Sequence, residues 1–267
     1  MGVTRRDALR AALFGGGALL IGSTARPARS REPSYRRLEG EGLLGRRATE
    51  ASALMAGCHL CPRACGVNRR KGERGFCRAP ERAVVYSAHA HFGEEAPLVG
   101  RGGSGTIFFS HCNLRCVFCQ NWPISHEGRG EEVSDEELAG LMLRLQEIGC
   151  HNINLVTPTH VMPAILGALR VACAKGLSIP LVYNTSGYER VDALRLLDGV
   201  VDIYLPDMNV NLMAKYRVEY KAYEYPEIAR GITVEELLEA VAWAEEAGLT
   251  NLDGRTRALA DYYRARR

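Results

Sequence analysis

The chain has 267 residues, of which 46% are hydrophobic and 24% charged, and its formal net charge is +3. These values are typical of one large globular domain, or of one domain with a small appendage, and they allow a substantial core. The weak net charge argues against nucleic acid as a partner. Seven of the nine cysteines fall between Cys58 and Cys119 in two tight groups, which favours metal binding over disulfide cross-links.

Residues 1–25 have the pattern of an export signal. Arg5 and Arg6 precede an apolar run at 11–22, and small residues follow at 23–25. This order is that of a secretory signal, and Thr-Arg-Arg-x-x-Leu resembles the twin-arginine type. The apolar run is too short for a stable membrane span. We expect export to the periplasm or the exterior. The alternative is a cytoplasmic protein with a basic disordered arm, or a misassigned start.

The next segment, 26–53, is polar and Arg-rich, and it is expected to be a linker with one short helix at most. A cysteine-rich module is expected at 54–100. Its cysteines are Cys58, Cys61, Cys65 and Cys77, in the spacing C-x2-C-x3-C-x11-C. Four thiolates so close in sequence can surround one ion or one cluster. Three interpretations stay open, because spacing alone does not choose between them: an auxiliary iron–sulfur cluster, zinc, or no stable metal.

A predicted strand at 106–110 leads directly into a second cysteine group. Cys112, Cys116 and Cys119 follow the spacing C-x3-C-x2-C, with Phe118 before the last cysteine. Three thiolates leave one iron of a [4Fe-4S] cluster without a protein ligand, and an open metal position can bind a substrate or cofactor. Zinc is the alternative, but no fourth cysteine follows within 30 residues to complete two close pairs. The spacing therefore favours the cluster.

The body of the chain, expected at 101–208, alternates between strands and helices. Strands are expected at 106–110, 153–157, 179–184 and 201–205, and helices at 134–148, 163–175 and 189–198. Ser134 and Glu137 form a predicted capping box at the start of the first of these helices. Such alternation predicts an α/β fold with a parallel sheet and right-handed crossovers. Polar loops follow all four strands, at 111–121, 157–160, 184–187 and 206–207. Because the carboxyl ends of parallel strands meet at one edge, these loops predict a single site there.

These residues resemble a known family, the radical S-adenosylmethionine (SAM) proteins related to pyruvate formate-lyase activating enzymes. The resemblance is strongest to the branch with an N-terminal C-x2-C-P-R-x-C-G-V-N-R segment. The matching stretches are 58–68, 91–95, 103–121, 154–160, 204–207 and the tail 210–253, which includes 224–228 and 247–252. The resemblance implies a partial (β/α) barrel with a small N-terminal cysteine-rich module.

The resemblance also implies a cofactor site. Cys112, Cys116 and Cys119 would hold a [4Fe-4S] cluster whose open iron binds SAM. Phe118 would pack near the adenine, and Thr157, Asn184 and Ser186 would contact SAM. From the residues alone, Phe118 is equally compatible with a core aromatic. His160 suits a helix cap better than a proton donor, and Asp207 suits either a ligand contact or a turn.

The implied reaction is reductive cleavage of SAM to a 5′-deoxyadenosyl radical, which abstracts hydrogen from a substrate. A flavodoxin- or ferredoxin-like protein would supply the electron, and the substrate is unknown, with a glycyl-radical-type protein or a peptide among the candidates. A non-catalytic iron–sulfur or zinc protein, such as an electron carrier or a degenerate half-barrel, is the alternative. Fold kinship alone does not choose the substrate.

One departure from the family affects the fold. The family carries a long stretch between Leu-Pro-Asp and Val-Asn-Leu-Met, whereas Asp207 and Val210 almost adjoin here. We therefore expect a shortened barrel with four strands instead of six, through loss of two βα units or a gap in the gene sequence. The remaining tail, 209–267, is expected to be helical, with a capped helix at 233–248 and a frayed helix at the end.

Overall fold

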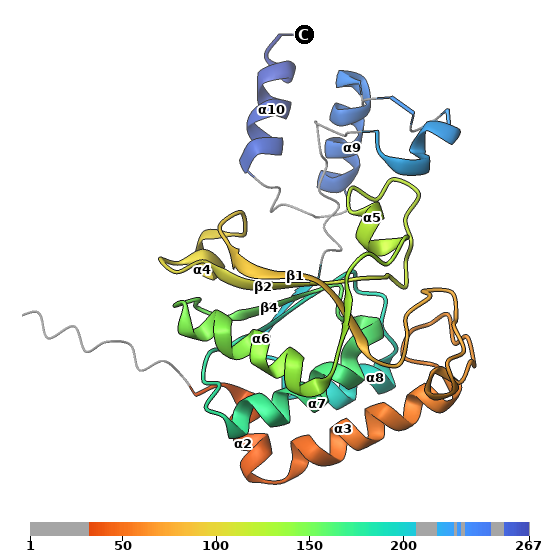
Figure 1. Cartoon of the computed structure of the whole chain (residues 1–267). Coiled ribbons are helices and arrows are strands. Elements are labelled where there is room, and N and C mark those ends of the chain that lie inside the picture. The colour runs from red at the N-terminus through yellow and green to blue at the C-terminus, as the bar shows by residue number, and fades with distance from the viewer. Residues whose placement is uncertain (1–31, 207–217, 227–228, 231–232, 247–253, 267) are drawn as a thin grey trace, which may run out of the picture. The chain divides into compact units, whose positions relative to one another are not determined.

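A computed structural model describes residues 32–206, 218–226, 229–230, 233–246 and 254–266 (Figure 1). The predicted export signal and Asp207 lie outside these residues. The centre is a six-stranded sheet in the order β3-β1-β2-β4-β5-β6. The strands are β1 (Ala83–His91), β2 (Ser104–Phe109), β3 (Glu131–Val133), β4 (Ile153–Val156), β5 (Leu181–Thr185) and β6 (Ile203–Pro206). Strands β2, β4, β5 and β6 are parallel, while β1 runs antiparallel to β2 and β3.

The α/β class and the four predicted strands are confirmed as β2, β4, β5 and β6. The expected count of four strands is wrong, because β1 and β3 extend the sheet at its N-terminal side. These two strands precede β4 in sequence, so they do not replace the later strands that the resemblance implies. Strand β1 also belongs to the segment expected to be a separate module at 54–100, and it pairs with β2 along most of its length.

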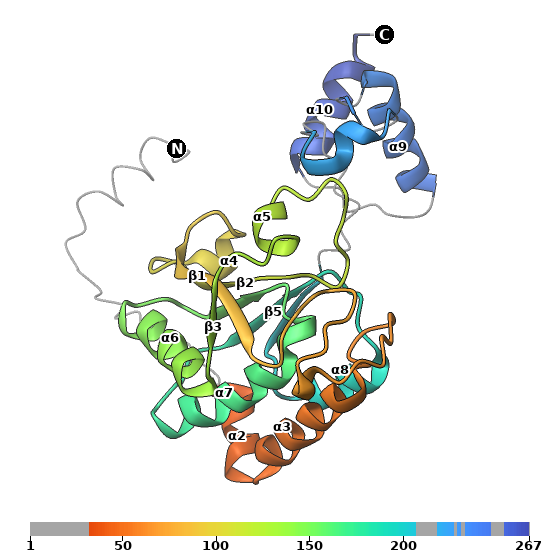
Figure 2. The same cartoon turned by 45° about the vertical axis from the view of Figure 1, so that its right-hand side comes forward.

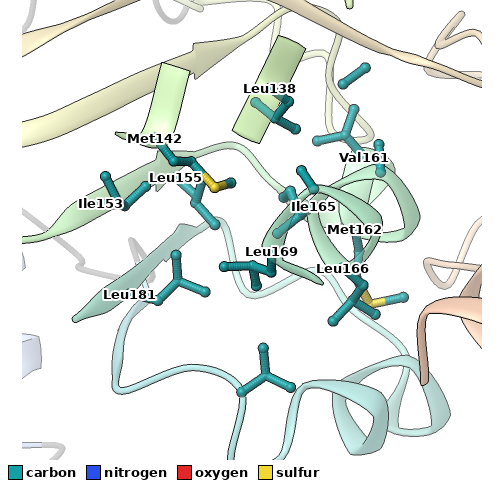
Figure 3. Close-up of a cluster of buried hydrophobic side chains, with 14 of the residues drawn as sticks. Leu138, Met142, Ile153, Leu155, Val161, Met162, Ile165, Leu166, Leu169 and Leu181 are labelled. Atoms are coloured by element: carbon teal, nitrogen blue, oxygen red, sulfur yellow. The ribbon is translucent and has the colours of Figure 1, made fainter. Parts of the chain in front are cut away.

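Helices cover one face of the sheet, as Figures 1 and 2 show. They are the crossover helices α6 (Asp135–Glu147), α7 (Met162–Ala174) and α8 (Val191–Leu197), with α2 (Ser34–Gly40) and α3 (Leu43–Ala53) lying beyond them. Figure 3 shows buried side chains of α6 and α7, among them Met142 and Ile165, packed on Leu155 and Leu181 of the sheet. The predicted capping box of α6 is confirmed, with the Ser134 hydroxyl and the Glu137 carboxylate each accepting a backbone N–H.

The linker expected at 26–53 is wrong for residues 34–53, because α2 and α3 are part of the core. Tyr35 and Leu44 are fully buried, and the Tyr35 hydroxyl donates to the Ile179 carbonyl at 2.9 Å. Helix α3 packs along α7. Its buried face combines leucine with small alanine side chains between arginines, so its helical period is weak when read from the sequence.

The remaining described helices are short or C-terminal. They are α4 (Ala96–Val99), α5 (Trp122–Ser125), α9 (Val234–Glu246), α10 (Gly254–Arg264) and the 3-10 turns η1 (Leu54–Gly57), η2 (Arg69–Lys71), η3 (Thr159–Val161) and η4 (Tyr220–Glu224). Helices α9 and α10 share a small apolar cluster that includes Leu237 and Ala260. Among the described residues, no helix has the length and apolarity needed to cross a membrane.

Candidate functional site

The carboxyl ends of three parallel strands bring the predicted site residues to one edge of the sheet. Phe108 of β2 pairs with Val156 of β4, and Val156 pairs with Asn184 of β5. The loops that follow these strands therefore start side by side. The Thr157 amide donates to the Asn184 carbonyl at 3.0 Å, which joins two of the predicted SAM-contact positions directly.

The loop after β2, residues 111–121, is called the triplet loop here. Its three cysteines are free, and each is partly buried. Burial raises the pKa of the Cys112 thiol, and the neighbouring Cys119 thiol raises it further. Burial, followed by the charges of Cys112 and Cys119, likewise raises the pKa of Cys116. Neighbouring thiol charges on one loop are an arrangement that a bound cationic cluster stabilises.

Donors reach two of these sulfurs. The Leu114 amide donates to the Cys112 sulfur at 3.4 Å, and the Ser125 hydroxyl donates to the Cys119 sulfur at 3.2 Å. Hydrogen bonds to sulfur stabilise thiolate charge and tune an iron–sulfur cluster. The donor set, three thiols on one loop with two supporting donors, fits a [4Fe-4S] cluster with one open iron.

Phe118 is 49% exposed, which excludes the interpretation of a plain core aromatic. Asn184 and Ser186 are half-buried at the same sheet edge, and the Ser186 hydroxyl oxygen is buried without a partner in the described part of the chain. Polar groups are therefore present beside the triplet loop on the β5 side.

Sequence reasoning missed Glu189. Its carboxylate accepts from the Thr159 hydroxyl at 2.6 Å and also from the Thr185 hydroxyl. It thereby ties the loop after β4 to the end of β5. The available signal was an acidic residue two positions after the predicted polar turn at 184–187.

His160 is buried and neutral. Its Nε2 lies 2.8 Å from the Ser110 carbonyl, so Nε2 carries the hydrogen because a carbonyl can only accept. Burial lowers the pKa of His160 to about 3. A ring held neutral with no exposed proton is a structural bridge between η3 and the end of β2, and not the proton donor considered from the sequence.

The second cysteine group lines one pocket. Cys58, Cys61, Cys65 and Cys77 surround it together with Asn113 and His160. Tight turns bring them there, since the Cys58 amide donates to the Val67 carbonyl and the Gly66 amide donates to the Cys58 carbonyl. Burial raises the pKa of both Cys61 and Cys77, while Arg69 acts in the opposite direction on Cys77. We call this the four-cysteine pocket.

In the described part of the chain, no three Cys, His, Asp or Glu side chains converge as the ligands of a single metal ion do. Zinc draws its thiolates to about 2.3 Å from one centre. A cluster of four irons spaces its thiolates more widely. The described side chains thus form no preformed site for a single ion, and this does not choose between zinc and a cluster.

The six-stranded, mostly parallel sheet with its crossover helices is consistent with an enzyme class whose site lies at the carboxyl ends of the strands. A sequence model of the Radical SAM superfamily matches residues 106–257, and the chain belongs to this superfamily. Its members generally bind a [4Fe-4S] cluster and SAM and need a one-electron reductant.

Two proteins of Methanocaldococcus jannaschii are similar to this chain. The uncharacterized protein MJ0674 is 31% identical over 278 residues, covering 78% of this chain and 80% of that protein. The uncharacterized protein MJ0808 is 25% identical over 215 residues, covering 72% of this chain and 57% of that protein. No solved structure matches.

The match to MJ0674 contains an internal difference in length. Its span of 278 residues is longer than the whole 267-residue chain, although only 78% of the chain takes part. The relative therefore has positions within the span that lack a counterpart here.

Proposed function

We propose that this chain is a radical SAM enzyme of the branch related to pyruvate formate-lyase activating enzymes. In it, Cys112, Cys116 and Cys119 hold the [4Fe-4S] cluster and leave one iron open to SAM. The observation that carries the proposal is the set of three free, partly buried cysteines on the triplet loop. The loop lies at the sheet edge where the β4 and β5 loops begin.

When bound, the cluster supplies the electron that cleaves SAM to a 5′-deoxyadenosyl radical, which abstracts hydrogen from the substrate. The chain's own residues bind the cluster and SAM and hold them in the orientation that the reaction needs. The Leu114 amide and the Ser125 hydroxyl stabilise sulfur charge. The exposed ring of Phe118 offers a face on which adenine can stack.

Thr157, Asn184 and Ser186 present polar groups for the amino acid and ribose parts of SAM. Their common position at one edge of the sheet supports this role. The buried Ser186 hydroxyl oxygen, which has no partner among the described residues, is available as an acceptor or donor for such a ligand. Asp207 lies outside the described residues.

Cys58, Cys61, Cys65 and Cys77 are proposed to hold a second centre, an auxiliary iron–sulfur cluster or zinc. Their placement around one pocket supports this assignment. Metal affinity of a site that is unformed in the unfolded chain adds to folding free energy. If the quadruple Cys→Ser variant holds as much metal and sulfide as the parent, this second centre does not exist.

The proposal also includes a flavodoxin- or ferredoxin-like reductant and a glycyl-radical-type protein or peptide as substrate. It further includes export by the twin-arginine route. The alternative is a non-catalytic iron–sulfur or zinc protein, an electron carrier or a degenerate half-barrel. Exposed Ile203 and Tyr204 on the edge strand β6 favour this alternative, because they indicate an incomplete barrel wall.

The test is anaerobic reconstitution of the parent chain, followed by EPR of the reduced cluster with and without SAM. We expect SAM to change the spectrum and to be cleaved reductively. Replacement of all three triplet cysteines by Ala abolishes both effects, whereas Cys173→Ala, which removes a half-buried cysteine outside both groups, leaves them intact. A parent spectrum that does not respond to SAM identifies an electron carrier instead.

A further inference from the structure

Arg63 connects the four-cysteine pocket to the triplet loop. It lies between Cys61 and Cys65 in sequence, and its Nε donates to the Asn113 carbonyl at 2.7 Å. A second nitrogen donates to the Leu114 carbonyl at 3.4 Å. The planar guanidinium holds two successive carbonyls, immediately after Cys112, which a point charge such as an ammonium cannot match.

The position of Arg63 is itself held from the pocket side. Its guanidinium carbon lies 3.4 Å from the centre of the Phe76 ring, and Phe76 precedes Cys77. Stacking of a guanidinium on an aromatic face restricts the side chain without using its hydrogen-bond donors. The two cysteine-bearing turns of the pocket thus set where Arg63 presents its donors.

Arg69 makes a second connection, on the other side of Cys112. It is 1% exposed and donates to the carbonyls of Pro80 and His160. His160 in turn donates to the Ser110 carbonyl at 2.8 Å. Residues on both sides of Cys112 are therefore tied to the cysteine-rich segment.

The buried charge of Arg69 also lacks a carboxylate partner among the described residues, since its three hydrogen bonds all go to backbone carbonyls. A buried cation needs a compensating charge. Arg69 lines the four-cysteine pocket, and four thiolates around one ion or cluster carry excess negative charge. The pocket in its loaded form supplies that compensation.

The triplet loop needs such support because its backbone is strained. His111 and Arg115 have φ of 70° and 53°, values that non-glycine residues rarely adopt and that persist only where the surroundings enforce them. Asn113 stands at the junction. It is 1% exposed, lines the pocket, and its side-chain amide donates to the Tyr188 carbonyl at 2.9 Å.

We propose that the loaded four-cysteine pocket is a structural centre that positions the triplet loop, with Arg63 and Arg69 bracing the two sides of Cys112. The inference rests on the proposed function and assigns a purpose to its second centre. Arg63 is a positioning residue. It acts on the cluster and on SAM only through the backbone of Asn113 and Leu114.

The test compares Arg63→Ala with Arg63→Lys and with the matched control Arg70→Ala, which removes an exposed arginine of the same segment. Each protein is reconstituted with iron and sulfide, and in a parallel preparation with zinc. The readouts are metal at the four-cysteine pocket, thermal unfolding, the SAM-induced EPR change and the dissociation constant of SAM. We expect Arg63→Ala to keep its pocket metal and its melting temperature, while the SAM dissociation constant rises about tenfold.

Arg63→Lys should give an intermediate value, and Arg70→Ala should match the parent. A second variant, Cys77→Ser, weakens the pocket centre without touching the triplet thiols, and it should reproduce the SAM defect of Arg63→Ala. Parental SAM binding and EPR response in both variants overturn the inference. A parent that itself never responds to SAM overturns the proposed function instead, so the two failures are distinguishable.

Discussion

Strained backbone is concentrated where the site residues lie. Thr157, a β-branched residue, has a φ of 59°, and His111 and Arg115 lie in the same left-handed region. Such conformations cost about 1–3 kcal/mol each and occur mostly at sites where the geometry serves function. Here the strain turns the chain abruptly at the ends of β2 and β4, so that polar groups follow within one residue of each strand.

Replacing Thr157 with Gly should therefore increase stability. Relief of the strain outweighs the roughly 0.5–1 kcal/mol that glycine loses through backbone entropy. Denaturant unfolding should show a gain of up to about 1 kcal/mol, while SAM binding weakens because the hydroxyl is lost. The matched control, Thr106→Gly in strand β2, should be destabilised, because Thr106 is buried in regular strand backbone. Equal destabilisation of both variants would argue that the Thr157 turn is unstrained.

His160 makes stability depend on pH. Burial lowers its pKa from 6.5 to about 3. Between these values the unfolded chain binds a proton at this residue and the folded chain does not. The contribution of His160 to stability is thus complete above pH 6.5 and is lost as pH falls toward 3.

His160→Gln retains a donor for the Ser110 carbonyl but does not titrate. Its unfolding free energy should fall less steeply than that of the parent between pH 6.5 and pH 4, by about 1 kcal/mol per pH unit. Urea unfolding at a series of pH values measures this difference. Parallel pH profiles of the two proteins would mean that the pKa of His160 is the same in the folded and the unfolded chain.

At the scale of elements, helix α3 shows that part of the segment expected to be a linker belongs to the core. Its buried residues include Leu44 and Ala51, both fully enclosed against the rest of the core. Helix α3 lies along α7, which itself covers the sheet, so it forms a third layer (Figure 2). It leads through η1 to Cys58, the first cysteine of the four-cysteine pocket. The packing of α3 on the core therefore anchors the chain where it enters the pocket.

Leu44→Ala should lower the free energy of unfolding by about 2–5 kcal/mol, the usual cost of a cavity at a fully buried leucine. Leu43→Ala is the matched control, because Leu43 is adjacent to Leu44 in sequence but its side chain is only partly buried. We expect Leu43→Ala to lose less than half as much unfolding free energy as Leu44→Ala. A Leu44→Ala variant as stable as the parent would support the original interpretation of this segment as a linker.

For the molecule as a whole, the described sheet ends at β6. Ile203 and Tyr204 of this strand are 39% and 44% exposed. An edge strand with exposed apolar side chains is unusual in a finished fold. The extra positions of MJ0674 within its match to this chain are consistent with a missing segment.

We therefore expect the isolated chain to cleave SAM slowly and without coupling to a specific product. An incomplete barrel admits water to the site, where a radical is quenched. The ratio of 5′-deoxyadenosine to substrate product, measured by chromatography after anaerobic turnover, should be well above one. A one-to-one ratio would mean that the C-terminal tail completes the wall of the site. Adding a partner protein that covers the β6 edge should bring the ratio down.

The sequence by itself determined the four parallel strands, the crossover helices with the Ser134 cap, and the two cysteine groups. These features depend on local period, capping chemistry and spacing, which neighbouring residues encode. Only the tertiary structure decided that residues 34–53 belong to the core, that β1 and β3 extend the sheet, and that His160 is neutral. It also decided that Arg63, Arg69 and Glu189 link separate loops. Each of these depends on contacts between residues far apart in the chain, and burial and hydrogen-bond partners across such distances leave no periodic signal in the sequence.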